Sequence, residues 1–203
     1  MPSTIPSGYG ARMKPWLRYL TCAVIGLAGG AGFAVWQVRA GAFGANVTIG
    51  PWTTGTDFGT AQASAKTRAV VALRGLLALP ASEARYYTAA TDDTGQPLDG
   101  RCRYRLSGGA LPAKWWSITV YDGAGYLVKN DAGVYSLGSA ALSPDEQARW
   151  NVVLAPDRQA GHWLPTGRID HVELTLRVYL PADGGRGNLA RTQLPAITRE
   201  ACA

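Results

Sequence analysis

The sequence contains few of the residues that most often carry enzyme or metal chemistry. It has two histidines, His162 and His171, and three cysteines, and none of the cysteines forms a CxxC pair. A Ser-His-Asp arrangement needs a nucleophile, a base and an orienting acid within hydrogen-bond reach, and no GxSxG sequence supplies the nucleophile. The spacing of the histidines, with Asp170 beside them, matches no standard ligand pattern. The sequence therefore favours a protein without metal or cofactor and leans away from catalysis.

Charged residues are absent from the run between Tyr19 and Val38. At about 1.5 Å rise per residue, a helix of this length crosses the roughly 30 Å hydrocarbon core of a bilayer. We therefore predict a transmembrane anchor that contacts the lipid bilayer through residues 16–39. It divides the chain into a cytoplasmic tail (1–15), the anchor (16–39), a Gly- and Thr-rich linker (40–60) and one exported domain (61–203).

Basic residues flank this run unequally, because Arg12, Lys14 and Arg18 precede it and Arg39 alone follows. Lys and Arg near a span tend to remain in the cytoplasm. We therefore expect a single pass through a bacterial inner membrane, with the N-terminus in the cytoplasm and the C-terminal domain in the periplasm. The rival interpretation is a signal peptide cleaved near Ala40, which would release a secreted protein.

Gly26 and Gly30 form a small-xxx-small pair on the predicted span. Such a pair lets a second helix approach closely, so this face of the span is a candidate contact for a membrane-protein partner. The other interpretation is that these are ordinary small residues of a lipid anchor.

The formal net charge of +6 gives little support for nucleic-acid binding. Four of the basic residues lie at or before Arg39, where no acidic residue occurs, so the rest of the chain holds 16 Lys and Arg against 14 Asp and Glu. A nearly neutral module with interspersed charges lacks the basic patch of a nucleic-acid-binding protein. We expect no nucleic-acid partner.

Cys22 lies in the predicted span, which leaves Cys102 and Cys202 as the cysteines of the exported domain. In an oxidising compartment a pair of thiols tends to end as a disulfide. Such a bridge would close a loop of about 100 residues and hold the C-terminus in place. Two buried or free thiols are the alternative.

Hydrophobic periodicity changes from helical to alternating along the exported domain. Residues 61–79 repeat apolar side chains at helical spacing, and Pro80 ends that helix. Short alternating segments follow, and Ser143 is placed to cap one helical turn. Many short alternating strands with turns between them indicate a mainly β fold, an antiparallel β-sandwich or barrel-like sheet with one flanking helix. The expected strands are 84–90, 101–106, 114–121, 126–128, 133–137, 150–154 and 172–180.

A series of short motifs in this region resembles a known family. The motifs are Arg85-Tyr86-Tyr87, Asp92 to Gly95, Leu98-Asp99-Gly100, Tyr104-Arg105-Leu106, Trp115 to Asp122, Asn130, Trp163-Leu164-Pro165 and Leu176 to Tyr179. In order and spacing, over residues 65–181, they are similar to the family catalogued as domain of unknown function 1214, here in a short membrane-anchored form. The resemblance implies a β-sandwich of jelly-roll character. It implies no activity and no catalytic residue.

Arginines and aromatic residues recur on the polar faces of three predicted strands. They would form one surface if these faces met. Flat aromatic rings and guanidinium donors suit a carbohydrate or an anionic ligand with carboxylate or phosphate groups. The alternative is a solvated sheet face whose arginines are paired to Glu173 or nearby Asp. The candidate ligand-binding residues are Arg101, Arg103, Arg105, Trp115, Tyr121 and Arg177.

These observations favour a non-catalytic, membrane-anchored envelope module that binds a ligand or partner through one sheet face. One alternative is a hydrolase-like envelope enzyme, for which Asp92, Asp122, His162 and Arg177 are the candidate residues and would have to gather in one pocket. Another is a structural subunit of a membrane complex that docks through the Gly26 and Gly30 face.

Overall fold

The computed structural model describes residues 14–39, 47–55, 60, 63–73 and 79–202, and it divides the chain into two units, residues 1–40 and 41–203. The first unit contains helix α1 (Pro15–Arg39). Within the described residues, this is the one helix long and apolar enough to cross a membrane, over Pro15–Trp36. Its side chains up to Trp36 are exposed, including Leu27 and Ile25.

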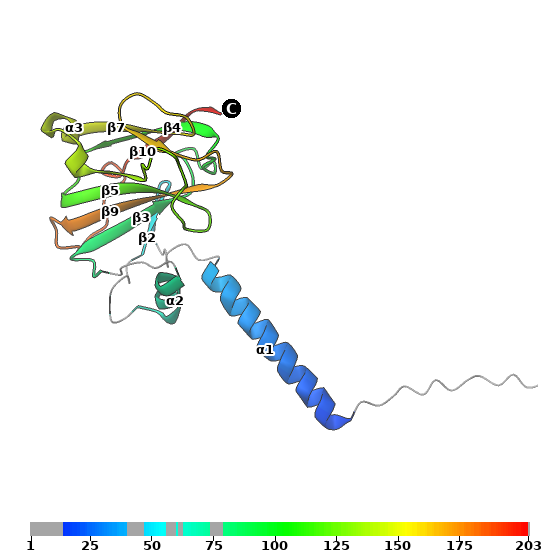
Figure 1. The fold of residues 1–203 in the computed structure, drawn as a ribbon. Coiled ribbons are helices and arrows are strands. Elements are labelled where there is room, and N and C mark those ends of the chain that lie inside the picture. Colours follow the sequence, from blue (N-terminus) through cyan, green and yellow to red (C-terminus); the bar gives the residue numbers. More distant parts are fainter. Residues whose placement is uncertain (1–13, 40–46, 56–59, 61–62, 74–78, 203) are drawn as a thin grey trace, which may run out of the picture. The chain divides into compact units, whose positions relative to one another are not determined.

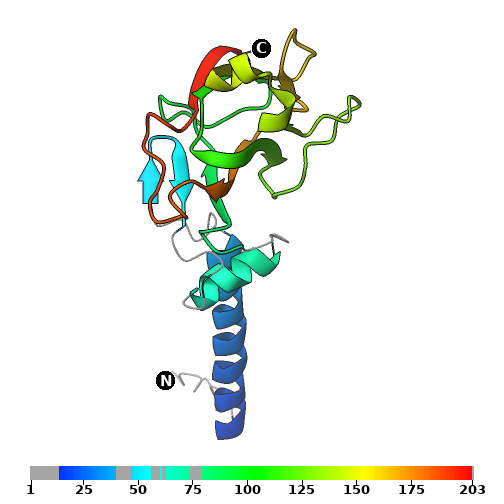
Figure 2. The same cartoon turned by 90° about the vertical axis from the view of Figure 1, so that its left-hand side faces the viewer.

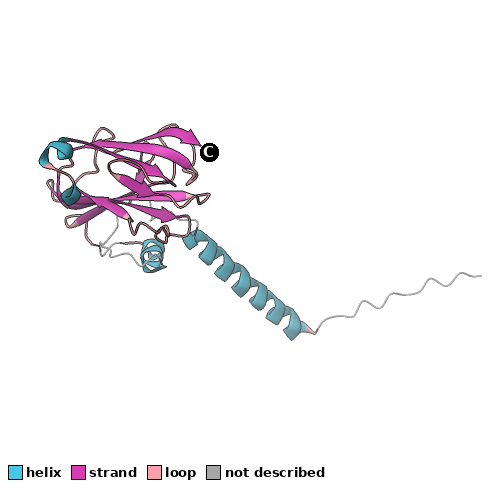
Figure 3. Ribbon diagram, turned by 45° about the horizontal axis from the view of Figure 1, so that its top comes forward, coloured by secondary structure: helices cyan, strands magenta, loops and turns pink. Residues whose placement is uncertain are grey.

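The second unit is mainly β and consists of two sheets stacked as a sandwich (Figures 1 and 3). All strand pairs of the six-stranded sheet are antiparallel. Its order is β1 (Val47–Ile49), β2 (Trp52–Thr54), β3 (Ala84–Ala89), β9 (Val172–Pro181), β5 (Ala113–Asp122) and β6 (Ser136–Gly138).

The four-stranded sheet faces it across the core. It is antiparallel except for its last pair, β7 with β8, which is parallel. The chain passes repeatedly from one sheet to the other, as from β3 to β4 to β5, and such crossings are typical of double-sheet folds of the jelly-roll kind. The strand order is β10 (Ala196–Cys202), β4 (Cys102–Gly109), β7 (Arg149–Ala155) and β8 (Trp163–Pro165).

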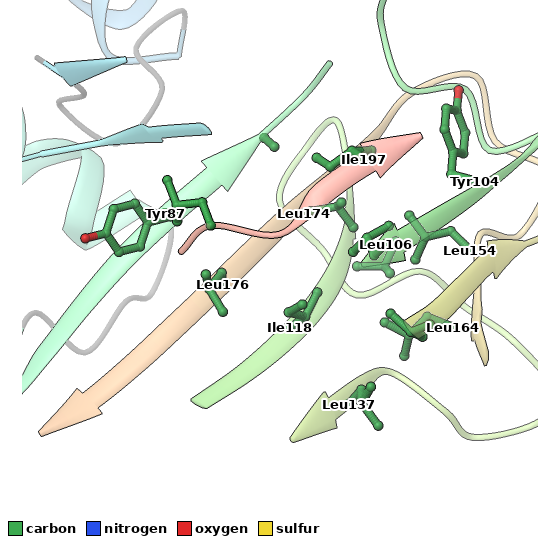
Figure 4. Close-up of a cluster of buried hydrophobic side chains, with 14 of the residues drawn as sticks. Tyr87, Tyr104, Leu106, Ile118, Leu137, Leu154, Leu164, Leu174, Leu176 and Ile197 are labelled. Atoms are coloured by element: carbon green, nitrogen blue, oxygen red, sulfur yellow. The ribbon is translucent and has the colours of Figure 1, made fainter. Parts of the chain in front are cut away.

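The core lies between the sheets and follows the alternation of the sequence. On β4, Tyr104 and Leu106 are fully buried while Arg103 and Arg105 are exposed. Because successive side chains of a strand point to opposite faces, each strand contributes every second residue to this core. Figure 4 shows the buried side chains of both sheets gathered in one cluster.

Two predictions about helices can be compared with the structure. Helix α2 (Ala65–Leu73) lies inside the predicted span 61–79, and the Ser64 hydroxyl caps it by accepting a hydrogen bond from the Thr67 N–H at 3.0 Å. Residues 61–62 and 74–78 of the predicted helix lie outside the described part of the chain. Helix α3 (Pro144–Ala148) begins at the predicted Ser143 cap, with a capping box to Glu146.

The prediction that residues 40–60 are only a linker is wrong for residues 47–54. These residues form β1 and β2, a small hairpin at the side of the domain that pairs with β3 (Figure 2). The physical reason is Trp52, which is fully buried and donates a hydrogen bond from its indole N–H to the Pro195 carbonyl at 2.8 Å. The turn before it is made by Gly50, with a φ of 63°.

The strand expected at 126–128 is an isolated bridge between Tyr121 and Leu127, and β6 is shifted to Ser136–Gly138. The cysteines predicted to pair lie opposite each other on β4 and β10 and form the Cys102–Cys202 disulfide. Cys102 is buried and Cys202 is exposed, so the bridge joins the core to the surface at the open edge of the four-stranded sheet.

Candidate functional site

The structure does not bring the six candidate ligand-binding residues onto one surface. Arg103 and Arg105 point outward from β4, and Arg101 immediately precedes that strand. Trp115 and Tyr121 of β5 and Arg177 of β9 belong to the other sheet, on the face that does not contact the core. Since the inner faces of the two sheets pack together, their outer faces point in opposite directions. The expectation of a single surface is therefore wrong.

Carboxylates neutralise the three arginines around β4. Glu200 of β10 accepts from Arg103 at 2.7 Å and from Arg105 at 2.5 Å. Arg101 contacts Asp99 at 2.6 Å and Asp170 at 3.3 Å. At these three positions the structure agrees with the alternative of paired surface arginines, although the partners are not Glu173.

Arg177 is different, because the contacts of its guanidinium are with neutral groups. It donates to the Thr119 hydroxyl at 3.0 Å and to the Tyr121 hydroxyl at 2.5 Å, and it lies 5.5 Å from the centre of the Tyr121 ring. No carboxylate among the described residues forms an ion pair with it. Its positive charge is held half-buried by hydroxyl groups and a π face, and none of these neutralises it.

Aromatic side chains flank Arg177 on the same face. Register places Tyr86 and Ser117 opposite Arg177, and it places Tyr179 opposite Trp115 one row along. The Trp115 and Tyr179 rings lie 5.2 Å apart, and Trp115 is 39 % exposed. We call this surface the Arg177 face, and it consists of Tyr86, Trp115, Thr119, Tyr121, Arg177 and Tyr179.

Tyr86 closes one side of the Arg177 face as a neutral phenol. Burial raises its pKa, and the neighbouring Tyr179 raises it further, while the charge of Arg177 opposes the shift. Helix α2 lies on this side of the six-stranded sheet, away from the four-stranded sheet (Figures 1 and 3). The face therefore has a covered end at β3 and an exposed aromatic end at Trp115.

The four residues proposed for an enzyme do not converge. Asp92 accepts hydrogen bonds from Thr94 and Gln96 within its own turn and pairs with Arg199, and Asp122 likewise accepts from its own hairpin turn. His162 contacts Glu146 at 3.2 Å. No hydrogen bond or ion pair joins any two of Asp92, Asp122, His162 and Arg177, all of which the structure describes.

The pairing of Asp99 with Arg101 predicts an acid-dependent loss of stability. Hydrogen bonds from the Arg101 side chain and backbone lower the pKa of Asp99 to about 2. A lowered folded-state pKa gives stability that is present above the unfolded value of about 3.9 and is lost as the pH falls through about 2. Because the pair is at the surface, we expect Asp99→Asn to reduce the free energy of unfolding by only about 1 kcal/mol at pH 7.

Denaturant unfolding of both proteins between pH 7 and pH 2 measures this difference. It should shrink below pH 4 and be largely lost at pH 2. Asp170→Asn is the matched control, because Asp170 is 75 % exposed and more distant from Arg101, and it should change little at any pH. A deficit in Asp99→Asn that is the same at pH 2 and pH 7 would contradict the assignment.

Sequence reasoning missed Tyr86 and Glu200 as determinants of these surfaces. Tyr86 is next to Tyr87 in the sequence, but its place opposite Arg177 depends on register between strands that are far apart in the chain. Glu200 lies on β10, whose polar sequence Thr198-Arg199-Glu200 shows little strand periodicity. Only the pairing of β10 with β4 explains why Arg103 and Arg105 are neutralised and Arg177 is not.

The fold and these surfaces together define a β-sandwich module. One of its outer faces carries, among aromatic rings, an arginine that no carboxylate of the described residues neutralises. The chain belongs to the family described as Protein of unknown function (DUF1214), whose model matches residues 83–183. That span contains all the candidate ligand-binding residues.

Among the solved structures that resemble the chain are two bacterial proteins. The VPA0106 protein from Vibrio parahaemolyticus is 21 % identical, with a TM-score of 0.56 over 95 % of this chain and 47 % of its own. A putative uncharacterized protein from Burkholderia cenocepacia is also 21 % identical, with a TM-score of 0.39 over 58 % of this chain and 29 % of its own. The chain thus spans about half the length of the first structure, and the likeness concerns the fold alone. No curated protein matches the sequence.

Proposed function

We propose that this protein is a non-catalytic module of the bacterial envelope, anchored in the inner membrane by α1, that binds an acidic sugar on the Arg177 face. The observation that carries the proposal is the contrast between the arginines of the two outer faces. Carboxylates pair with Arg101, Arg103 and Arg105, whereas the partners of Arg177 among the described residues are all neutral. A half-buried guanidinium that no carboxylate of the described residues neutralises favours an anionic partner, and its planar fork fits a carboxylate.

The aromatic rings narrow the choice of ligand. Trp115 offers an exposed indole face, with Tyr179 against it at 5.2 Å. A pyranose ring presents an apolar C–H face that packs on such a surface, as an amphipathic ring does in other binding sites. A sugar that carries a carboxylate would use the indole and the guanidinium together. A phosphate or a simple carboxylate would leave the indole unused.

The membrane part of the proposal rests on two features. Helix α1 is long and apolar enough to span a bilayer, and basic residues are more numerous before it than after it. This arrangement favours a domain on the periplasmic side. A membrane-protein partner at Gly26 and Gly30 remains a prediction, and the failure of Asp92, Asp122, His162 and Arg177 to gather leaves the hydrolase alternative without a specific observation in its favour.

Isothermal titration of the full-length protein in phosphatidylcholine nanodiscs tests the function. The probe is trigalacturonate, and the neutral control ligand is maltotriose. We expect trigalacturonate to bind and Arg177→Gln to weaken that binding by about 10-fold or more, because a charge-assisted bidentate contact is lost. Trp115→Ala should also weaken binding, through loss of the stacking surface.

Arg103→Gln is the matched control variant, because it removes the same charge from the opposite face. Its affinity should lie within about twofold of the wild type, since rim or remote charges contribute little. The proposal is rejected if the wild-type protein does not bind trigalacturonate, if maltotriose binds as tightly, or if Arg103→Gln is as harmful as Arg177→Gln. The melting temperature of each variant, read by circular dichroism, separates lost binding from lost folding.

A further inference from the structure

A cavity of about 380 Å³ lies at one end of the sandwich, away from the Arg177 face. It is bounded by the inner side of β3 and β9 and by the loop that follows β9. Its apolar wall is formed by Pro112, Val178, Pro181 and Leu189. Its polar lining residues are Arg85, Asp183, Asn188 and Gln193. A volume of this size is at the lower end of the range for small-molecule sites.

Arg85 is 8 % exposed, and it occupies an inward position of β3, two residues before the core residue Tyr87. Its guanidinium donates to the Gly185 carbonyl at 2.7 Å and to the Asn188 side-chain oxygen. Both acceptors are neutral, and no carboxylate among the described residues forms an ion pair with Arg85. A buried charge is costly unless it is paired, so this cation lacks the partner that burial normally requires.

The lining of the same cavity also contains a carboxylate, that of Asp183. Its two oxygens accept the backbone N–H groups of Gly187 and Gly185, each at 2.8 Å. These hydrogen bonds, with a smaller contribution from the charge of Arg85, lower the pKa of Asp183. Asp183 is thus ionised and occupied in shaping the loop, and it does not neutralise Arg85 by direct contact.

The loop that carries these groups has a fixed conformation. Gly185 has a φ of 73°, and a Cβ atom there would lie 2.0 Å from the Ala81 carbonyl oxygen. Only glycine is compatible with that approach. Leu189 is held from the other side, because its backbone N–H donates to the Tyr87 hydroxyl at 2.9 Å. Arg85 and the apolar wall are therefore preorganised around the same space.

We propose that this cavity binds a small monocarboxylate with a short apolar tail. The carboxylate would take the guanidinium donors of Arg85 that the loop does not use, since an arginine carries five N–H donors. The tail would pack on Pro112, Val178 and Pro181. The nearby negative charge of Asp183 disfavours a dianion such as phosphate more than a monoanion, and the apolar wall offers few donors to a second anionic group.

Ligand-detected NMR with the full-length protein in phosphatidylcholine nanodiscs tests this site, with empty nanodiscs as the background. The probes are hexanoate, hexanol and hexylamine. We expect hexanoate to bind with saturation below about 1 mM, and hexanol and hexylamine to bind at least about 10-fold more weakly, because they lack the anionic group that pairs with Arg85. Equal binding of hexanol, or no saturable hexanoate signal up to 10 mM as a rough upper limit, would overturn the proposal.

Three variants assign the binding to the cavity. Arg85→Met should abolish it, and Ala182→Trp should also abolish it by filling the cavity, because Ala182 is an exposed lining residue that does not contact Arg85 through any hydrogen bond. Ala182→Trp therefore decides the question if Arg85→Met fails to fold. Arg177→Gln should bind hexanoate as the wild type does, which separates this site from the Arg177 face. Unchanged binding in a folded Ala182→Trp protein would show that the ligand sits elsewhere.

Discussion

Loss of the Cys102–Cys202 disulfide is expected to lower the free energy of unfolding of the sheet domain by about 2–4 kcal/mol. The bridge joins residues 100 positions apart, so it restricts most of the unfolded domain. Chain-entropy reasoning gives about 4–5 kcal/mol for a loop of that length, and measured values are often smaller. For a domain of this size the loss corresponds to a fall of roughly 5–15 °C in melting temperature.

The effect should arise mainly in the unfolded chain, because other contacts hold β10 in the folded protein. Ile197 is fully buried, and its backbone N–H donates to Asp93 at 2.8 Å. Glu200 pairs with Arg103 and Arg105. The Cys102→Ala/Cys202→Ala double variant should therefore fold to the same structure, with the same far-ultraviolet circular dichroism, and unfold earlier.

The measurement compares thermal and denaturant unfolding of the full-length wild type, the double variant and Cys22→Ala. Cys22 is the free cysteine of the described chain and lies on α1, so its replacement controls for loss of a thiol. A melting temperature of the double variant within about 1 °C of the wild type would contradict the expected contribution of the bridge. Alkylation of the protein in intact cells adds a test of the export proposal, because Cys102 and Cys202 should not react if the domain reaches an oxidising compartment.

Alternation along the chain was sufficient to assign side chains to faces but not to sheets. The sequence separated Tyr104 and Leu106 from Arg103 and Arg105 correctly, because a period of two is a local property. It could not decide whether β4 and β5 belong to the same sheet, since pairing between strands is set by contacts distant in sequence. The expected single surface failed at this step.

The strands β1, β2 and β10 were also not predicted from the sequence. The Gly- and Thr-rich composition around Trp52 resembles a linker, and only the burial of that indole makes β1 and β2 part of the sheet. β10 contains the charged residues Arg199 and Glu200, and its strand character comes from Ile197 and from pairing with β4. Propensity was overridden by tertiary contacts in both places.

Which arginines are paired with carboxylates also could not be predicted from the local sequence, because it depends on contacts between strands that are distant in the chain. Nothing in the sequence distinguishes Arg103 from Arg177, since both occur on the polar side of an alternating strand. Glu200 reaches Arg103 from a strand nearly 100 residues away, whereas none of the carboxylates that the structure describes pairs with Arg177. The burial of Arg85 could not be predicted from the sequence either, because it occupies an inward position where an apolar residue is the usual choice.

Replacement of Trp150 by alanine is expected to reduce the free energy of unfolding by about 3–5 kcal/mol. Trp150 is 2 % exposed, stacks on Trp116 with ring centres 4.7 Å apart, and donates from its indole N–H to the Gly109 carbonyl at 3.0 Å. Trp150 is paired with Gly108 of β4, and the indole ring lies over that glycine. Truncation leaves a large cavity in the core and an unpaired carbonyl beside it.

A substitution at Gly108 is expected to interact with the loss of the Trp150 indole. A Cβ atom at Gly108 would lie 2.2 Å from the Trp150 ring, which is buried and cannot move aside freely. Gly108→Ala should therefore cost about 1–3 kcal/mol through overpacking. In Gly108→Ala/Trp150→Ala the new methyl group enters the space that the indole has left. The double variant should then be no less stable than Trp150→Ala alone, so the two effects are far from additive.

Denaturant unfolding followed by circular dichroism completes this cycle, because fluorescence would change with the removed indole. Gly123→Ala is the matched control: a Cβ there makes ordinary contact with His171 at 3.6 Å, and stability should change by no more than about 0.5 kcal/mol. If the losses of the two single variants simply add in the double variant, the methyl group and the indole do not compete for the same space. The absence of a side chain at Gly108, where β4 pairs with β7 beside the Trp150 indole, would then require another explanation.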